Sequence, residues 1–146
     1  RRATDTAGGR VPRLAARDPF VRLLGIECIG GGDGSAAVRL RVDPQHLNFN
    51  GGCHGGVIFA LADTAFGLAS NSHGRIASGI EAHISFHVGV REGDLLTARA
   101  VEIARGNKVA TYRIDVSRDD ATLVASFSGT VYVSARANEP DTAAQA

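Results

Sequence analysis

The sequence lacks most of the features that mark secreted, membrane-spanning and nucleic-acid-binding proteins. It contains only two cysteines, Cys28 and Cys53, too few for a disulfide framework, so we expect free thiols in a reducing compartment. No apolar run approaches the roughly 20 residues that a membrane-spanning helix needs, and residues 1–10 lack the apolar segment of a secretory signal. The formal net charge of +1 favours neither nucleic acid nor a membrane surface as a partner. We therefore expect a soluble, cytoplasmic protein.

The length and composition of the chain fit one globular domain. A chain of 146 residues can bury one sizeable core but is too short for two ordinary domains. Both ends are polar and carry Gly, Ala or Pro, which favours flexibility over packing. We expect a flexible N-terminal extension over residues 1–17, a single domain over residues 18–134 and a flexible tail over residues 135–146.

The first part of the expected domain contains a short helix and two strands. Asp18 and Pro19 are typical of a helix start, so we expect a helix over residues 19–24. Alternating apolar residues predict strands over residues 26–29 and 36–42. The Gly-Gly-Gly-Asp-Gly run between them resembles a phosphate-binding loop only in composition, and we expect a hairpin turn.

One long apolar helix is expected over about residues 55–70, and a sheet follows it. Four alternating segments joined by short turns predict antiparallel strands. These segments are residues 80–88, 95–104, 109–117 and 123–133. An antiparallel sheet with one apolar face, covered by one apolar helix, is an α+β arrangement. We expect the helix to lie in the concave face of a curved sheet.

A single carboxylate, Asp63, interrupts this apolar helix. An ionised side chain in apolar surroundings is strongly disfavoured unless it is paired or its raised pKa is used. No Lys or Arg lies one helical turn away; those positions are Phe59, Ala60, Phe66 and Gly67. Asp63 is therefore either a buried structural aspartate bonded to backbone groups or a catalytic carboxylate, and we favour catalysis.

The segment around Asp63 resembles the hotdog-fold thioesterases, and within them the PaaI-like thioesterases of phenylacetate degradation. The resemblance rests on the pattern N-x-x-x-x-C-H-G-G-x-x-F-x-L-A-D-T-A, which occupies residues 48–65. It extends over about residues 18–133, through REGD-x-L-T-A and R-G-x-K. It implies a hotdog fold, a curved antiparallel sheet wrapped around one central helix. It also implies a homo-oligomer, a dimer of dimers, that hydrolyses acyl-coenzyme A esters between subunits without a metal or cofactor.

The same resemblance implies roles for individual residues. Asp63 matches the catalytic carboxylate, and Gly55 matches the residue whose backbone N–H polarises the thioester carbonyl. Asn48 and His54 match polar groups that shape the site. The further residues expected to contact the substrate are Gly56, Phe59, Thr64, Phe66, Arg105 and Lys108. The chain departs from the family at Gly79, where some relatives place a water-orienting Ser, and at residues 87–90, where relatives commonly carry a Leu-Arg-Pro-type stretch.

Elementary chemistry supports part of this assignment. Thioester hydrolysis needs stabilisation of charge on the carbonyl oxygen and activation of water. His54, Gly55 and Gly56 open the long helix, where free N–H groups and the positive end of the helix dipole point outward. Asp63 lies eight residues beyond Gly55, about 12 Å away at a rise of about 1.5 Å per residue. We therefore expect Asp63 of one subunit to act with Gly55 of a second, the two helices running antiparallel.

Other candidate sites are weaker. Cys53 and His54 are adjacent, so their side chains diverge, and we expect a small buried thiol in place of a nucleophile. His83 and His87 lie about 13 Å apart on the expected strand, which disfavours a metal site. His46 is expected as a surface loop residue.

Two turn residues, Arg105 and Lys108, are candidates for charge-assisted bonds to coenzyme A phosphates; the alternative is that both are solvated. Phe59 and Phe66 flank Asp63 and could line an aromatic pocket, which fits phenylacetyl or hydroxyphenylacetyl groups, with medium-chain acyl groups left open.

Three functions remain open at this point: an acyl-coenzyme A thioesterase, a hotdog hydratase or dehydratase, and a non-catalytic acyl-coenzyme A sensor. A hydratase needs a His general base near the helix, whose interior offers only Asp63. A sensor would usually need a DNA-binding segment, against which length and charge argue. We therefore favour the thioesterase.

Overall fold

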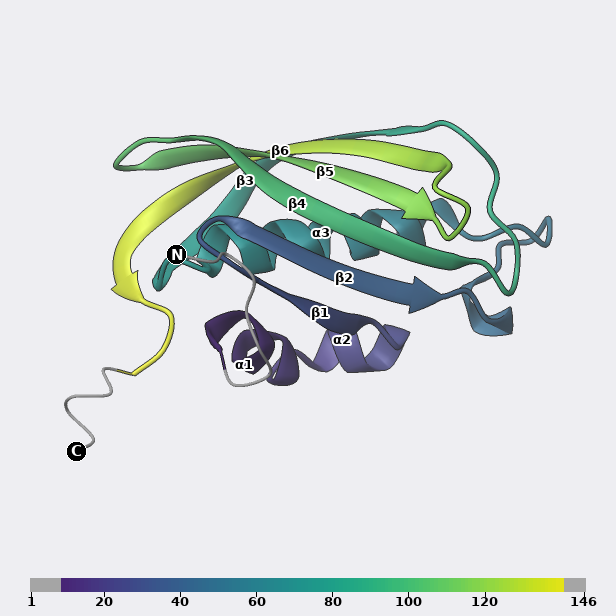
Figure 1. The fold of residues 1–146 in the computed structure, drawn as a ribbon, viewed down its shortest axis with the longest axis horizontal. Coiled ribbons are helices and arrows are strands. Elements are labelled where there is room, and N and C mark those ends of the chain that lie inside the picture. Colours follow the sequence, from purple (N-terminus) through teal and green to yellow (C-terminus); the bar gives the residue numbers. More distant parts are fainter. Residues whose placement is uncertain (1–8, 141–146) are drawn as a thin grey trace.

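A six-stranded antiparallel sheet and one long helix make up most of the molecule (Figure 1). The computed structural model describes residues 9–140. The elements in chain order are α1 (Arg10–Ala16), α2 (Pro19–Leu24), β1 (Glu27–Gly32), β2 (Ser35–Arg41), the 3-10 turn η1 (Pro44–His46), α3 (Gly55–Asn71), β3 (Arg75–Phe86), β4 (Leu95–Arg105), β5 (Val109–Arg118) and β6 (Leu123–Ala137). Within the described residues, no helix combines the length and apolar character that crossing a membrane would require.

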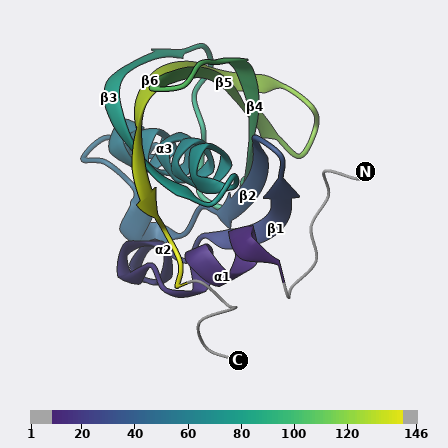
Figure 2. The same ribbon diagram turned by 90° about the vertical axis from the view of Figure 1, so that its left-hand side faces the viewer.

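The sheet curves around α3 (Figure 2). Its strand order is β1-β2-β4-β5-β6-β3, with every neighbouring pair antiparallel. The expected α+β architecture, a curved sheet wrapped around one central helix, is confirmed. The expected turns are confirmed too: the glycine-rich run forms the β1–β2 hairpin, and the later strands differ from their expected bounds by a few residues.

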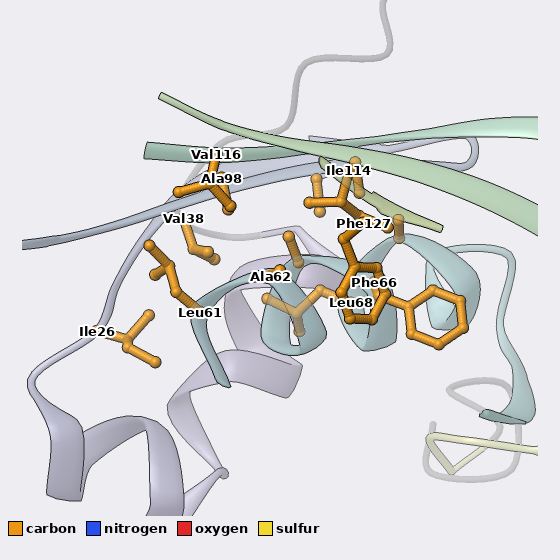
Figure 3. Close-up of a cluster of buried hydrophobic side chains, with 14 of the residues drawn as sticks. Ile26, Val38, Leu61, Ala62, Phe66, Leu68, Ala98, Ile114, Val116 and Phe127 are labelled. Atoms are coloured by element: carbon orange, nitrogen blue, oxygen red, sulfur yellow. The ribbon is translucent and has the colours of Figure 1, made fainter. Parts of the chain in front are cut away.

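The core lies between the concave face of the sheet and one side of α3 (Figure 3). Alternate residues of β2, β4 and β5 point inward, as the period-two pattern requires. Fully buried examples are Val38, Leu40, Ala98, Ile114 and Val116 from the strands and Leu61, Ala62 and Ala65 from α3. Burial of one Val, Leu or Ile side chain stabilises the fold by roughly 1.5–3 kcal/mol. This packing holds α3 firmly, and the sheet does not cover the other side of the helix.

Part of the expected flexible extension over residues 1–17 is a packed helix. Residues 10–16 form α1, where Val11 is fully buried and Ala15 is 5% exposed. Arg10 and Arg13 both pair with Glu139, at 3.1 and 3.0 Å, which ties the helix to the end of the chain. The polar sequence of α1 reflects arginines that bind across to the C-terminal segment. Residues 1–8 and 141–146 lie outside the described residues.

Helix α2 begins where the sequence predicts. The side chain of Asp18 accepts hydrogen bonds from the N–H groups of Phe20 and Val21, and Pro19 occupies the first helical position. Gly25, with φ of +78°, ends the helix.

Strand β3 differs most from its expected form. It begins at Arg75 instead of Ile80, and a bulge between Gly79 and Glu81 interrupts the alternation expected for residues 80–88. Ile80 is 62% exposed and Phe86 is 52% exposed, so the apolar residues of this strand do not form one buried face. β3 is an edge strand that pairs with β6, so half of its backbone polar groups face outward.

His46 is buried, which overturns its expected place on a surface loop. It is 2% exposed; its Nδ1 accepts a hydrogen bond from the Asp43 N–H, and its Nε2 lies 2.8 Å from the Leu24 carbonyl oxygen. The ring therefore joins η1 to the end of α2. Cys28 and Cys53 are not joined in a disulfide, as expected.

Candidate active site

The start of α3 presents an imidazole and a free backbone N–H side by side. His54 precedes the helix, and its Nδ1 accepts a hydrogen bond from the Gly56 N–H at 2.8 Å. In the neutral ring the proton then lies on Nε2. Because the His54 side chain is exposed, this Nε2–H can donate a hydrogen bond to a ligand. No hydrogen bond among the described residues uses the Gly55 N–H. The helix start can therefore donate to a carbonyl oxygen.

Of the two glycines after His54, only Gly56 is required by the packing. A Cβ at Gly56 would lie 2.9 Å from His54 Nδ1, which would break the capping bond. A Cβ at Gly55 would lie 3.4 Å from Cζ of Phe86, an ordinary van der Waals contact. Glycine thus leaves the Gly55 N–H open to a ligand.

Asn48 lies on the turn that leads into α3. Its Oδ1 accepts hydrogen bonds from the N–H groups of Asn50 and Gly52, at 2.8 and 3.2 Å. Its backbone N–H donates to the Gly52 carbonyl, so the turn is closed on both sides. The Asn48 amide oxygen is thereby committed to the turn, and its NH2 group makes no hydrogen bond with the described residues.

Asp63 lies on the side of α3 that the sheet does not cover. The side chain is exposed in the single chain, unlike the buried structural aspartate that was the alternative to a catalytic carboxylate. No described residue donates a hydrogen bond to it, and partial desolvation by the neighbouring helices nevertheless raises its pKa. Thr64 turns its hydroxyl to the Ala60 carbonyl at 2.7 Å. Asp63 is thus an unpaired carboxylate held on a rigid helix.

Gly55 and Asp63 do not meet within one chain. Eight residues of continuous helix separate them, about 12 Å at the α-helical rise of about 1.5 Å per residue. One carbonyl group cannot contact both. A site that used both groups would therefore need two chains.

A cavity of about 440 Å³ adjoins Asp63. Its walls come from the α1–α2 segment, the open side of α3 and the start of β3. Leu14 and Phe20, which line it, were not foreseen as site residues. The sequence feature that could have pointed to this wall is the helical spacing of Val11, Leu14 and Ala15, which marks α1 as a packed helix.

The two phenylalanines expected to line a pocket differ in position. Phe66 is 3% exposed; its ring packs beneath the sheet, 5.6 Å from Phe127 between centroids, so the expectation of substrate contact does not hold. Phe59 is 36% exposed and meets Phe127 edge-on at 5.3 Å. Only Phe59 keeps a surface that a substrate could reach.

The basic turn residues lie apart from the cavity beside Asp63. Arg105 Nη1 is 3.8 Å from Glu102, which also accepts hydrogen bonds from the Tyr112 hydroxyl at 2.6 Å and His73 at 2.8 Å. Burial acts to raise the pKa of Glu102, but these hydrogen bonds and nearby positive charge outweigh it, and the pKa is lowered. Lys108 is exposed.

The other candidate groups of the sequence lie outside any metal site in the described residues. Within residues 9–140 no three His, Cys, Asp or Glu side chains gather in a way that could hold a metal ion. His87 Nε2 lies 2.9 Å from the Ser126 hydroxyl on the surface. Burial raises the pKa of Cys53 to about 11, so this thiol is a poor nucleophile at neutral pH.

Comparison with known proteins gives consistent matches. Residues 50–125 match the model of the thioesterase superfamily. A protein of Archaeoglobus fulgidus is 44% identical over 122 residues, which cover 84% of this chain and 77% of the relative. The acyl-coenzyme A thioesterase PaaI of Escherichia coli is 38% identical over 112 residues, covering 77% of this chain and 80% of that protein.

Solved structures agree with these matches. The E. coli PaaI structure superposes with a TM-score of 0.84 at 34% identity, covering 86% of this chain and 91% of that one. A Streptococcus mutans protein bound to acetyl-CoA superposes with a TM-score of 0.74 at 26% identity, covering 77% and 91%.

Proposed function

Because the chain belongs to the thioesterase superfamily and is an acyl-CoA thioesterase of the PaaI type, we propose that it hydrolyses aryl or medium-size acyl-CoA esters. Phenylacetyl-CoA and hydroxyphenylacetyl-CoA are the proposed preferred substrates, and the products are the free acid and CoA. The observation that carries this proposal is the pair of uncommitted groups on α3, the Gly55 N–H and the Asp63 carboxylate.

The proposed reaction uses these groups as oxyanion donor and general base. The Asp63 carboxylate removes a proton from water, and the water oxygen bonds to the thioester carbonyl carbon. The Gly55 N–H, at the positive end of α3, stabilises the charge on the carbonyl oxygen. Collapse of this intermediate breaks the C–S bond, and the departing CoA sulfur takes up the proton.

The neighbouring polar residues are proposed to orient the thioester. His54 Nε2–H and the NH2 group of Asn48 donate to no atom of residues 9–140, so both suit a carbonyl or amide oxygen of the substrate. Thr64, Gly56 and Phe59 remain proposed contacts.

The proposed active unit is a homodimer with antiparallel α3 helices. The outward edge of β3, twelve residues long, is open to pair with a second β3. The exposure of Phe49 supports the presence of a second subunit near the start of α3. This aromatic side chain is 98% exposed on the hydrogen-bonded turn that Asn48 anchors, and a second subunit would cover it. Such a dimer would bring Asp63 of one subunit toward Gly55 of the other.

A dimer of dimers is proposed from the convex face of the sheet. Apolar side chains are exposed near the β4–β5 hairpin, where a globular surface is usually polar. They are Val101, Ile103, Val109 and Tyr132. A second dimer would cover them.

The CoA moiety and the cellular location complete the proposal. The S. mutans relative is bound to acetyl-CoA, which supports CoA recognition here. Arg105 and Lys108 are proposed to meet the CoA phosphates. Two cysteines that are not joined in a disulfide, together with a CoA-linked substrate, fit the cytoplasm.

A panel of acyl-CoA esters tests the proposed activity. Free thiol release is measured for acetyl, butyryl, octanoyl, benzoyl, phenylacetyl and hydroxyphenylacetyl thioesters, beside the corresponding oxygen esters. We expect turnover of thioesters with the highest kcat/KM for the arylacetyl group. Absence of turnover for every thioester would overturn the proposal, and a preference for octanoyl-CoA would overturn the substrate assignment alone.

A further inference from the structure

The cavity beside Asp63 extends along α3 toward the C-terminal end of that helix. Its α3 wall runs from Ala60 through Asp63 and Gly67 to Asn71, about 16 Å of helix. The opposite wall contains Leu14 and Phe20 from the α1–α2 segment. The cavity therefore begins at the proposed base and leads away from the start of its own helix.

The polar groups in these walls are already bound to one another. The Arg17 guanidinium donates to the Asn138 carbonyl at 3.1 Å, and Asp18 caps α2. The Asn71 amide donates to the Gly67 and Ala77 carbonyls and accepts from the Ala77 N–H. Asp63 is the one carboxylate of the wall without a hydrogen bond from the described residues.

The remaining wall surface is apolar and lies on both sides of the cavity. Leu14 and Phe20 provide it from the N-terminal segment, and Leu68 and Ile76 provide it from α3 and β3. Phe20 is 51% exposed on a helix of six residues. Since a volume of about 440 Å³ is typical of ligand pockets, the cavity has room for a compact apolar group.

The N-terminal segment is fastened in place against this cavity. Arg10 and Arg13 bind Glu139, and the amide of Asn138 donates to the carbonyls of Asn71 and Arg75. The wall that carries Leu14 and Phe20 is therefore a fixed surface.

We propose that this cavity receives the acyl group of the substrate, that it belongs to the subunit that supplies Asp63, and that Phe20 and Gly67 set the largest acyl group accepted. The inference rests on the proposed thioesterase function. With the carbonyl held between Asp63 and the partner's Gly55, the acyl group extends along α3 beneath Phe20. The CoA moiety leaves in the opposite direction.

Substitutions that enlarge or fill the cavity test the inference. Phe20→Ala enlarges it, and Leu23→Ala is the matched control, because Leu23 is 71% exposed on the same helix and does not line the cavity. Gly67→Leu places a side chain in it, and the Cβ of that side chain meets no atom within 4 Å. Gly89→Ala, which also meets none, is its control.

The readout is kcat/KM across straight-chain and arylacetyl thioesters. Phe20→Ala should raise the kcat/KM of longer acyl groups relative to phenylacetyl by at least tenfold, since each buried methylene is worth about fourfold. Gly67→Leu should lower kcat/KM by a factor that grows with acyl size. Both controls should keep the wild-type profile. Unchanged profiles in both cavity variants would overturn the inference while leaving the thioesterase activity intact.

Mixed dimers test which of the two subunits that form a site supplies the acyl cavity. A Gly55→Val chain paired with an Asp63→Asn chain holds one intact site, built from Asp63 of the first chain and Gly55 of the second. Phe20→Ala should change the acyl profile when placed in the first chain and leave it unchanged in the second. The reverse result would overturn the assignment. If wild type hydrolyses no thioester, binding of non-hydrolysable acyl-CoA thioethers tests the same size dependence independently.

Discussion

His54 Nδ1 accepts the Gly56 N–H at 2.8 Å, and this one bond fixes two properties of the site. It caps α3 and satisfies one of the free N–H groups of its first turn. It also leaves the proton of the neutral imidazole on Nε2, directed outward. The capping function and the proposed donor function therefore belong to opposite atoms of the same ring and can be separated.

Two substitutions at His54 separate them. His54→Asn keeps a side-chain acceptor that can cap α3, while His54→Ala keeps neither function, so only Ala should lose about 1 kcal/mol of stability. Both should raise KM or lower kcat for acyl-CoA, because both lack the Nε2–H. Thermal unfolding and steady-state kinetics measure the two effects. Full activity in the Asn variant would show that His54 is only a cap.

Asp63→Asn should keep the fold and lose about 10²-fold or more in kcat, the size of contribution that a positioned general base makes. Because partial burial raises the Asp63 pKa, the carboxylate disfavours the folded state at neutral pH, and the variant should unfold at a slightly higher temperature. That stabilisation should vanish as the pH falls below the pKa of an unfolded aspartate. Single-turnover hydrolysis in labelled water adds a check: label in Asp63 would identify a nucleophile in place of a base.

The pH dependence of kcat/KM should reveal the ionisation of the Asp63 carboxylate. A raised pKa means that Asp63 takes up a proton at a higher pH than an ordinary aspartate, with its value of 3.8. Since the protonated form cannot accept a proton from water, kcat/KM should fall on the acid side with an apparent pKa above 3.8. A profile that stays flat down to that value would contradict the assignment.

Mixed dimers should recover activity that each parent lacks. Gly55→Val closes the helix start against Phe86, and Asp63→Asn removes the base, so each homodimer should be nearly inactive. Co-refolded chains should regain a fraction of wild-type kcat, because a mixed dimer holds one intact site. Native mass spectrometry establishes that mixed dimers form. No recovery in a preparation rich in them would exclude a site shared between subunits.

Local patterns in the sequence predicted most of the fold. The cap at Asp18 and the period-two strands follow from interactions within a few residues, so α2 and the strands β4 to β6 came out close to their observed bounds. The predicted surface position of His46 was wrong, because its burial depends on the Leu24 carbonyl, which lies 22 residues away in the sequence. Helix α1 was not predicted, because its arginines bind Glu139, which lies far away in the sequence.

The site was predictable where one helix carries it and unpredictable where distant segments meet. Gly55 and Asp63 follow from the motif and the helical rise, which also separates them. The cavity wall at Leu14 and Phe20 depends on how α1 and α2 pack beside α3; the apolar spacing of α1 marks a packed helix but does not say which surface it packs against. Phe66 was misplaced because a helical neighbour of Asp63 can point toward either the sheet or solvent.

The ring of Phe66 is seated against two glycines, and their replacement should destabilise the fold in graded steps. A Cβ at Gly129 would lie 2.6 Å from Cζ of Phe66, and a Cβ at Gly79 would lie 3.0 Å from Cε2. This contact also explains the glycine at position 79, since a serine there would press on the same ring. Gly129→Ala should lose about 1–3 kcal/mol through overpacking, and Gly79→Ala should lose less. The control is Gly67→Ala, which meets no atom within 4 Å and should be neutral or stabilising in a helix interior. Chemical denaturation measures all three. Equal stability of Gly129→Ala and Gly67→Ala would show that Phe66 moves without penalty and that these glycines are not required by the ring.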